Sequence, residues 1–165
     1  KALRKVTDAV LDVHLMINEP IRYVEDFAKA GADIITIHYE ADSFEKIVLT
    51  VDKIKELGCK VGVAVKPDTP GPVLLAFMDV MDLALIMTVE PGFGGQSFME
   101  RMLPKIQGVR AVIDSNFPNC ELEVDGGINI KTAELVKQAG ANVLVAGSAF
   151  FGAEDKKAFA TSVKS

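Results

Sequence analysis

Short apolar runs alternate with longer amphipathic segments along the whole chain, and this rhythm most restricts how the chain can fold. The apolar runs have the length and the Val, Ile and Leu content of buried strands. The longer segments have the apolar spacing of helices that bury one face. Strands that are joined only by helices must pair in parallel. The alternation therefore predicts an α/β fold built on a parallel sheet.

The predicted elements follow each other without a linker or a low-complexity tract. We expect strands near Val13–Ile17, Ile34–Tyr39, Val61–Val65, Leu83–Val89, Leu122–Val124 and Val143–Ala146. We expect helices near Tyr23–Ala30, Phe44–Leu57, Pro72–Val80, Met99–Ile113, Thr132–Ala139 and Lys156–Val163. The segments Ala30–Asp33 and Ala139–Asn142 are nearly identical in sequence, and each leads from a helix into a strand. This similarity indicates an internal βα repeat.

Polar residues recur where the predicted strands end. They are His14, His38, Glu40, Lys66, Thr88, Glu90, Asp125 and the pair Gly147-Ser148. An open doubly wound sheet has a single crevice at its switch point, whereas a barrel gathers every strand end around one mouth. The pattern favours a (β/α)8 TIM barrel, although six βα units do not close an eight-stranded barrel.

Composition narrows the class of protein further. A chain of 165 residues allows one domain at about 150 residues per domain, so we expect residues 1–165 to form a single domain. With 49% hydrophobic and 25% charged residues, intrinsic disorder is excluded. The net charge of −5 and the lack of a basic run argue against nucleic acid as a partner. No apolar stretch approaches the ~20 residues of a membrane span, so we expect a soluble, cytoplasmic protein without a membrane partner.

Two glycine-rich turns follow the last two predicted strands. They are Asp125-Gly126-Gly127 and Ala146-Gly147-Ser148. Turns of this kind before a helix expose backbone N–H groups that can hold a phosphate, although either turn alone can simply be tight. The segment Glu90–Gln96 is also rich in glycine and predicts a mobile lid or a further anion-binding turn, with an ordinary surface loop as the alternative.

His14 and Asp125 are the candidates for metal chemistry. His14 interrupts an apolar strand, which is also the position of many buried structural histidines. Asp125 ends a strand just before a glycine turn, and together the two side chains offer a nitrogen and an oxygen to a divalent metal. His38 and Glu40 can add ligands or form a polar network inside the barrel, and the sequence does not separate these roles.

Three further residues have open interpretations. Lys66 can form a Schiff base, contact a phosphate or simply extend from the strand end into solvent. Met16 and Met87 are most simply core residues, although methionines beside a metal site would also exclude water.

Four segments together resemble the ribulose-phosphate 3-epimerase family over nearly the whole chain. They are Asp12–Ile17, Met87–Gln96, Glu123–Ile128 and Val145–Phe150, with the run PGFGGQ beside VDGG as the most specific part. The resemblance implies a ribulose-phosphate-binding barrel that interconverts D-ribulose 5-phosphate and D-xylulose 5-phosphate in the pentose phosphate pathway. The implied reaction removes the C3 proton with the help of a divalent metal, passes through an enediolate and uses two aspartates as acid and base.

The resemblance also implies roles for individual residues. His14 matches a metal-ligand histidine that also contacts substrate, and Asp125 matches an aspartate that is both a metal ligand and one of the two acid/base catalysts. Methionines beside the reacting centre match Met16 and Met87. The substrate- and phosphate-binding positions match Gly92, Phe93, Gly94, Gly95, Gly126, Gly127, Gly147 and Ser148. The metal can be Zn, Mn, Fe or Co, because His/Asp sites accept all of them.

One motif of the family has no counterpart in the sequence. The family carries His-x-Asp-Val-Met-Asp-Gly on its second strand, with a metal-ligand histidine and the second catalytic aspartate, whereas Asp79–Asp82 matches only its centre. We therefore expect the sequence to correspond to strands three to eight, six of the family's eight βα units. These residues alone should show negligible epimerase activity and weak metal binding.

Other functions remain open at this stage. A related hexulose-phosphate 3-epimerase, acting for example on allulose 6-phosphate, would use the same site. A non-catalytic phosphate-binding barrel fragment would need only the glycine turns, and a metal-free lyase or isomerase would need Lys66 or Glu90 as its base. We expect a sugar phosphate as the small-molecule partner and a homo-oligomer, because an incomplete barrel exposes its edge strands.

Overall fold

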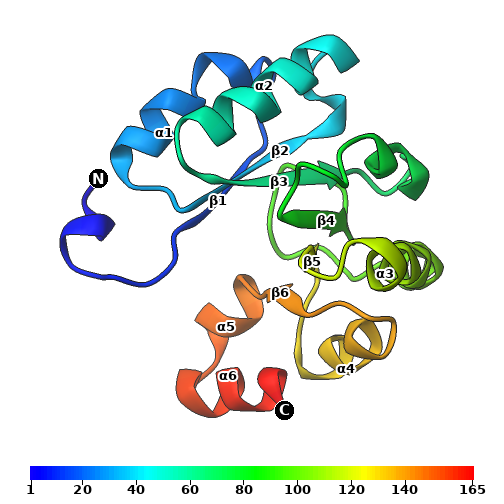
Figure 1. The fold of residues 1–165 in the computed structure, drawn as a ribbon. Coiled ribbons are helices and arrows are strands. Elements are labelled where there is room, and N and C mark those ends of the chain that lie inside the picture. Colours follow the sequence, from blue (N-terminus) through cyan, green and yellow to red (C-terminus); the bar gives the residue numbers. More distant parts are fainter.

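The computed structural model describes residues 1–165 and is built around one sheet of six strands in the order β1-β2-β3-β4-β5-β6. The strands are β1 (Asp12–Leu15), β2 (Ile34–His38), β3 (Lys60–Val65), β4 (Leu83–Met87), β5 (Glu121–Asp125) and β6 (Val143–Val145). All neighbouring strands are parallel. Because the order in the sheet follows the order in the chain, the sheet has no switch point. It curls in one direction with the helices along its outer side, as a parallel half-barrel (Figure 1).

The helices also follow the predicted alternation. They are α1 (Val24–Ala30), α2 (Phe44–Glu56), α3 (Leu103–Asn116), α4 (Ile130–Gln138), α5 (Ser148–Gly152) and α6 (Lys156–Lys164). The helix expected at Pro72–Val80 is instead the 3-10 helix η4 (Gly71–Ala76), a six-residue segment between β3 and β4, and 3-10 turns are frequent in such short connections. The short α5 was not predicted, because five residues do not show a helical period. None of the helices combines the length and apolar character needed to cross a bilayer.

The two faces of the sheet differ in polarity. Residues such as Ile35, Val63 and Val124 point outward and pack with the helices in a core of 29 buried residues. Only five buried apolar residues form the cluster on the inner face, which includes Leu85 and Met87. Successive side chains of a strand point to opposite faces, so polar residues at alternate positions share this inner face. The main hydrophobic core therefore lies between the sheet and the helices, and the inner face of the sheet carries the polar side chains.

The same side-chain hydrogen bond recurs in three of the five neighbouring strand pairs, β1–β2, β3–β4 and β5–β6. In each pair, the side chain just before the second strand accepts the backbone N–H of a residue at the start of the first. These bonds join Asp33 to Leu11 (2.7 Å), Asp82 to Val61 (2.9 Å) and Asn142 to Leu122 (2.7 Å). This shared role explains why the sequences before β2 and β6 are nearly identical. The partial match at Asp79–Asp82 lies just before β4, and Asp82 has this structural role.

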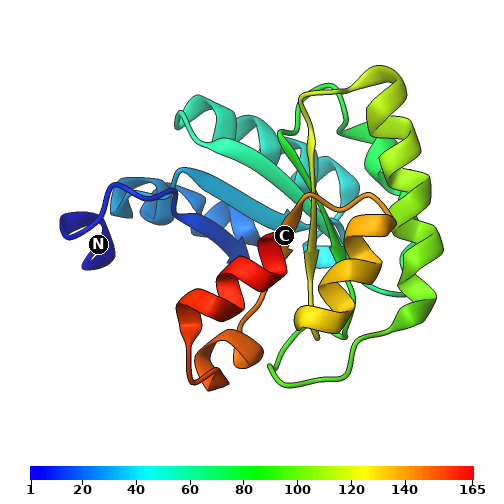
Figure 2. The ribbon, with the colours of Figure 1, turned by 90° about the horizontal axis from the view of Figure 1, so that it is seen from below.

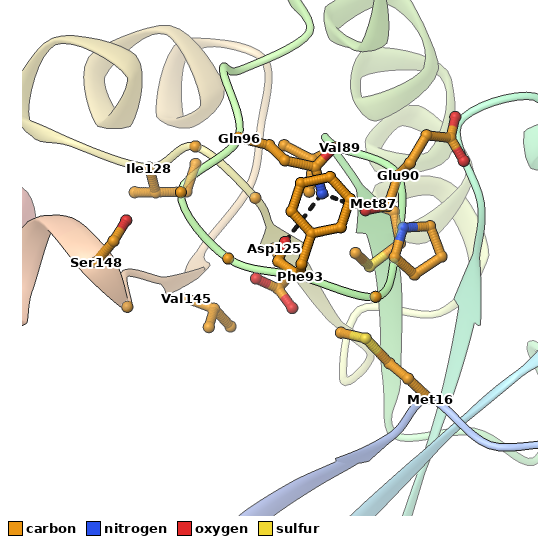
Figure 3. A pocket seen from close by; sticks show the side chains of 17 residues that line it. Met16, Met87, Val89, Glu90, Phe93, Gln96, Asp125, Ile128, Val145 and Ser148 are labelled. Atoms are coloured by element: carbon orange, nitrogen blue, oxygen red, sulfur yellow. Dashed lines mark hydrogen bonds between the residues drawn. The ribbon is translucent and has the colours of Figure 1, made fainter.

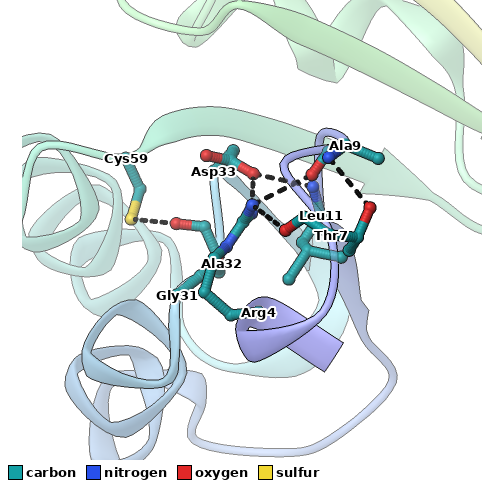
Figure 4. A network of polar contacts seen from close by, with 8 residues as sticks. All are labelled: Arg4, Thr7, Ala9, Leu11, Gly31, Ala32, Asp33 and Cys59. Atoms are coloured by element: carbon teal, nitrogen blue, oxygen red, sulfur yellow. Dashed lines mark hydrogen bonds and ion pairs between the residues drawn. The ribbon is translucent and has the colours of Figure 1, made fainter. Parts of the chain in front are cut away.

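Arg4 fastens the segment that precedes β1. Its guanidinium donates to the carbonyl oxygens of Thr7 and Ala9 in that segment and to that of Gly31 at the end of α1 (Figure 4). It also forms an ion pair with Asp33. The 3-10 helix η1 (Leu3–Lys5) therefore lies beside α1 at the margin of the fold (Figure 2).

Candidate active site

A pocket of about 260 Å³ opens where β4, β5 and β6 end (Figure 3). It is formed by three loops, at residues 89–96, 125–128 and 145–148, together with Met16 and Met87. The pocket contains these predicted site residues: Met16, Met87, Gly92, Phe93, Gly94, Gly95, Asp125, Gly126, Gly127, Gly147 and Ser148. Residues from segments far apart in the chain thus meet because parallel strands all end at the same edge of the sheet.

His14 does not line the pocket but contacts Asp125, which does. Its Nδ1 lies 3.3 Å from Oδ2 of Asp125, and the two side chains are only 15% and 22% exposed. A nitrogen and an oxygen donor therefore stand side by side at the carboxyl ends of β1 and β5. No group of three or more His, Cys, Asp or Glu side chains is arranged to hold a metal ion.

His38 and Glu40 extend this contact away from the pocket. Nε2 of His38 lies 2.8 Å from Nε2 of His14, and Nδ1 of His38 lies 3.3 Å from Oε2 of Glu40. Oε1 of Glu40 accepts the backbone N–H of Lys66 at 2.9 Å. Burial alone would raise the pKa of Glu40, but hydrogen bonds from His38, Thr69 and the Lys66 backbone outweigh it and lower the pKa to about 2.

Glu123 is a buried carboxyl group that no sequence motif indicates. It lies on the inner face of β5, two residues before Asp125, and is 3% exposed. Burial, together with the nearby charges of Asp12 and Asp125, raises its pKa to about 8. Its Oε2 has no hydrogen-bond partner. The only sequence signal was its alternation with Asp125 along the strand.

The turn after β5 requires both of its glycines. Gly126 and Gly127 have φ angles of +125° and +66°, which favour glycine. A Cβ on Gly127 would lie 2.5 Å from the backbone nitrogen of Phe98. Thr88 holds the turn from the other side, since its hydroxyl donates to the carbonyl oxygens of Asp125 and Gly126. The turn is therefore held in one conformation where it lines the pocket.

Gly147 is different because it faces open space. A Cβ there would meet no heavy atom within 4 Å, and its φ of −89° is accessible to other residues. Packing and backbone strain therefore do not require glycine at this position. Gly92, Gly94 and Gly95, in the loop after β4, also face open space, but the φ angles of Gly92 (+136°) and Gly95 (+76°) still favour glycine.

The difference between the packed Gly127 and the open Gly147 allows mutations to distinguish an effect on folding from an effect on ligand binding. We expect Gly127→Ala to lower the free energy of unfolding by about 2–4 kcal/mol, because the new methyl group collides with the Phe98 backbone. Gly147→Ala should change it by less than about 1 kcal/mol but weaken the binding of inorganic phosphate about tenfold, since the methyl group enters the pocket. Thermal melts and calorimetric titration measure the two effects. Equal destabilisation by both substitutions would contradict the prediction.

The loop after β4 has a defined shape. Gln96 Nε2 donates to the carbonyl oxygens of Glu90 (2.6 Å) and Phe93 (2.9 Å), which closes the loop on itself. The Phe93 side chain is 72% exposed. Lys66 is also exposed and lies with Glu40 and Gly92 in a smaller pocket next to the first. No Lys, Arg or His side chain lines the main pocket, so an anion in it would meet backbone N–H groups.

These features define a class: a parallel α/β half-barrel with a glycine-rich pocket and an acidic side chain where its strands end. The sequence profile described as the ribulose-phosphate 3 epimerase family matches residues 1–151. The chain therefore belongs to the ribulose-phosphate 3-epimerase family, whose members are isomerases.

Curated relatives agree with this assignment. Over 158 residues, or 95% of this chain, the sequence is 52% identical to the ribulose-phosphate 3-epimerase of Bacillus subtilis. It is also 52% identical over 154 residues, or 93% of this chain, to the chloroplastic ribulose-5-phosphate-3-epimerase of Arabidopsis thaliana. The alignments span 72% of the first relative and 55% of the second.

A solved structure agrees with the fold. A crystal structure of KGPDC from Streptococcus mutans superimposes with a TM-score of 0.76 at 17% identity, covering 99% of this chain and 75% of that one. At this identity the likeness concerns the fold alone.

Proposed function

We propose that the protein is a ribulose-phosphate 3-epimerase that interconverts D-ribulose 5-phosphate and D-xylulose 5-phosphate. One observation carries the proposal: the contact of His14 with Asp125 lies at the edge of the same pocket that the glycine turns line. A phosphorylated sugar with its phosphate on the turns would place its reacting carbons near the Asp125 carboxylate. Family membership supports this assignment.

The phosphate group is bound by the turns after β5 and β6 in this proposal. Gly126 and Gly127 line the pocket after β5, and Gly147 and Ser148 line it after β6. Backbone N–H groups in such turns bind phosphate without a cationic side chain, which fits a pocket that has none. The loop containing Gly92, Phe93, Gly94 and Gly95 would cover the substrate.

His14 and Asp125 would supply about half of the protein ligands of a divalent metal ion. A nitrogen and an oxygen donor, 3.3 Å apart, suit Zn, Mn, Fe or Co. We propose that His14 and Asp125 are two of the ligands and that this chain corresponds to strands three to eight of the barrel. The remaining ligands and the second acid/base carboxylate would then come from the first two βα units. When bound, the cation would supply positive charge beside the substrate oxygens at C2 and C3.

Asp125 is the acid/base group that this chain contributes. Its carboxylate can take the C3 proton on one face of the substrate or return a proton to that face. Inversion needs a second proton carrier on the opposite face. Met16 and Met87 line the pocket near Asp125, where their apolar side chains would keep water from the deprotonated carbon.

The test is an assay of the protein expressed from its own gene. We expect it to convert D-ribulose 5-phosphate to D-xylulose 5-phosphate, to lose activity with a chelator and to regain it with a divalent metal. Allulose 6-phosphate should react more slowly under the same conditions, and the reverse preference would favour the hexulose-phosphate enzyme. If the protein binds the sugar phosphate with an affinity that neither metal nor chelator changes, and shows no turnover, it is a non-catalytic binding protein.

A further inference from the structure

His14 and His38 are the two histidines of the chain, and they are in direct contact. Their rings stack with centroids 4.9 Å apart and an interplanar angle of 23°. His38 is 4% exposed, and both of its ring nitrogens have partners, Glu40 on one side and His14 on the other. These contacts favour the second of the two roles that the sequence left open, a polar network, with His38 placed behind His14.

Counting protons along this network fixes the direction of each hydrogen bond. Glu40 stays ionised because its pKa is about 2, so its Oε2 accepts a hydrogen bond and Nδ1 of His38 must donate it. A neutral imidazole carries one N–H, so Nε2 of His38 is then an acceptor. When both imidazoles are neutral, the 2.8 Å contact between the two Nε2 atoms then requires Nε2 of His14 to carry the hydrogen.

The consequence appears at the other nitrogen of His14. With the hydrogen on Nε2, a neutral His14 has a bare lone pair on Nδ1, which lies 3.3 Å from Oδ2 of Asp125. Two acceptor atoms that face each other repel unless a cation lies between them. We propose that His38 and Glu40 are positioning residues that hold His14 in this tautomer, so that Nδ1 and the Asp125 carboxylate form a ready pair of cation ligands.

A hydrogen bond from the loop after β3 fixes the position of the Glu40 carboxylate. Its Oε1 accepts the backbone N–H of Lys66 at 2.9 Å. Lys105 on α3 donates from Nζ to the carbonyl oxygens of Lys66 (3.2 Å), Pro67 (2.6 Å) and Thr69 (2.6 Å), which fixes the loop that follows β3. A carboxylate that turned away from His38 would therefore lose its hydrogen bond to Lys66 in this fixed loop. Partners of this kind commonly fix the tautomer of a metal-ligating histidine.

Imidazole nitrogen NMR tests the proposal on the metal-free protein, whether or not it is an epimerase. We expect a long-range ¹H–¹⁵N spectrum of the ¹⁵N-labelled chain at pH 9 to show His38 protonated at Nδ1 and His14 protonated at Nε2. In Glu40→Gln the amide can donate as well as accept, so the Nδ1–H form of His14 should become populated. The Co²⁺ affinity of this variant should fall about 10–100-fold. Glu134→Gln removes an exposed carboxylate on α4, away from the pocket, and should change neither readout.

The outcomes separate this inference from the proposed function, on which the cation's role rests. If His14 is protonated mainly at Nδ1 in the wild-type protein, the inference is wrong, and this result needs no variant to fold. An unchanged Co²⁺ affinity in folded Glu40→Gln also overturns it. The expected tautomers and a weakened Co²⁺ affinity in a protein that does not epimerise ribulose 5-phosphate would uphold the inference and refute the proposed function.

Discussion

Replacing Asp125 with asparagine is expected to slow the epimerisation of ribulose 5-phosphate by at least about 10³-fold. A positioned proton carrier alone contributes about 10²–10⁴-fold. The substitution also removes the negative charge that faces Nδ1 of His14 at 3.3 Å, so it weakens the proposed metal site at the same time. The amide has the shape of the carboxylate, and the turn is held by backbone groups of residues 125 and 126, so the fold should be retained.

A matched control for this experiment lies in the same pocket. Glu90 also lines it, but its side chain is exposed at the loop after β4. Glu90→Gln should therefore keep turnover within about threefold of the wild-type rate. Steady-state rates of both variants with saturating metal give the comparison. If Glu90→Gln is the more damaging change, the base has been misassigned, and the metal-free isomerase that would use Glu90 becomes the better hypothesis.

The parallel sheet could be predicted from the sequence because its two faces have different compositions. Val61, Val63 and Val65 alternate with Gly62 and Ala64, so β3 shows both its helix-facing side and its crowded inner side. The contact between His14 and Asp125 could be expected only in outline. Strand ends of a parallel sheet share one edge, but which of them touch depends on the curvature of the whole half-barrel.

Other features depend on contacts that no local pattern contains. Lys105 resembles a solvent-exposed helix residue in the sequence, yet it binds three carbonyl oxygens of the loop after β3. Its role depends on how α3 packs against that loop. Glu123 alternates with Asp125 in the sequence, but its burial depends on how tightly the sheet curls around it. Such residues are positioned by tertiary packing, and the structure is needed to find them.

Glu123→Gln is expected to make the protein more stable at alkaline pH and to leave its stability nearly unchanged at pH 4.5. The pKa of this carboxyl group is about 8 in the folded protein, against 4.5 as its ordinary value. The folded state therefore holds the proton more tightly than the unfolded state. This contribution to stability is fully present below about pH 4.5 and is lost as the pH rises through about 8.

The expected magnitude follows from the same two pKa values. The difference corresponds to about 5 kcal/mol of stability lost between acidic and alkaline pH. Glutamine resembles the protonated carboxyl group and does not titrate, so Glu123→Gln should keep this stability. Urea unfolding at pH 4.5 and at pH 9, with a chelator present so that no metal cation offsets the charges of Asp12 and Asp125, measures the difference.

Glu134→Gln provides the matched control, because it makes the same change of charge at an exposed position of α4. Its effect on the free energy of unfolding should stay below about 0.5 kcal/mol at both pH values. An advantage of Glu123→Gln that fails to grow between pH 4.5 and pH 9 would mean that burial does not keep Glu123 protonated. A growing advantage would show that the inner face holds a neutral acid two residues from Asp125. The fold would then concentrate negative charge at the strand end, beside His14, rather than spread it along β5.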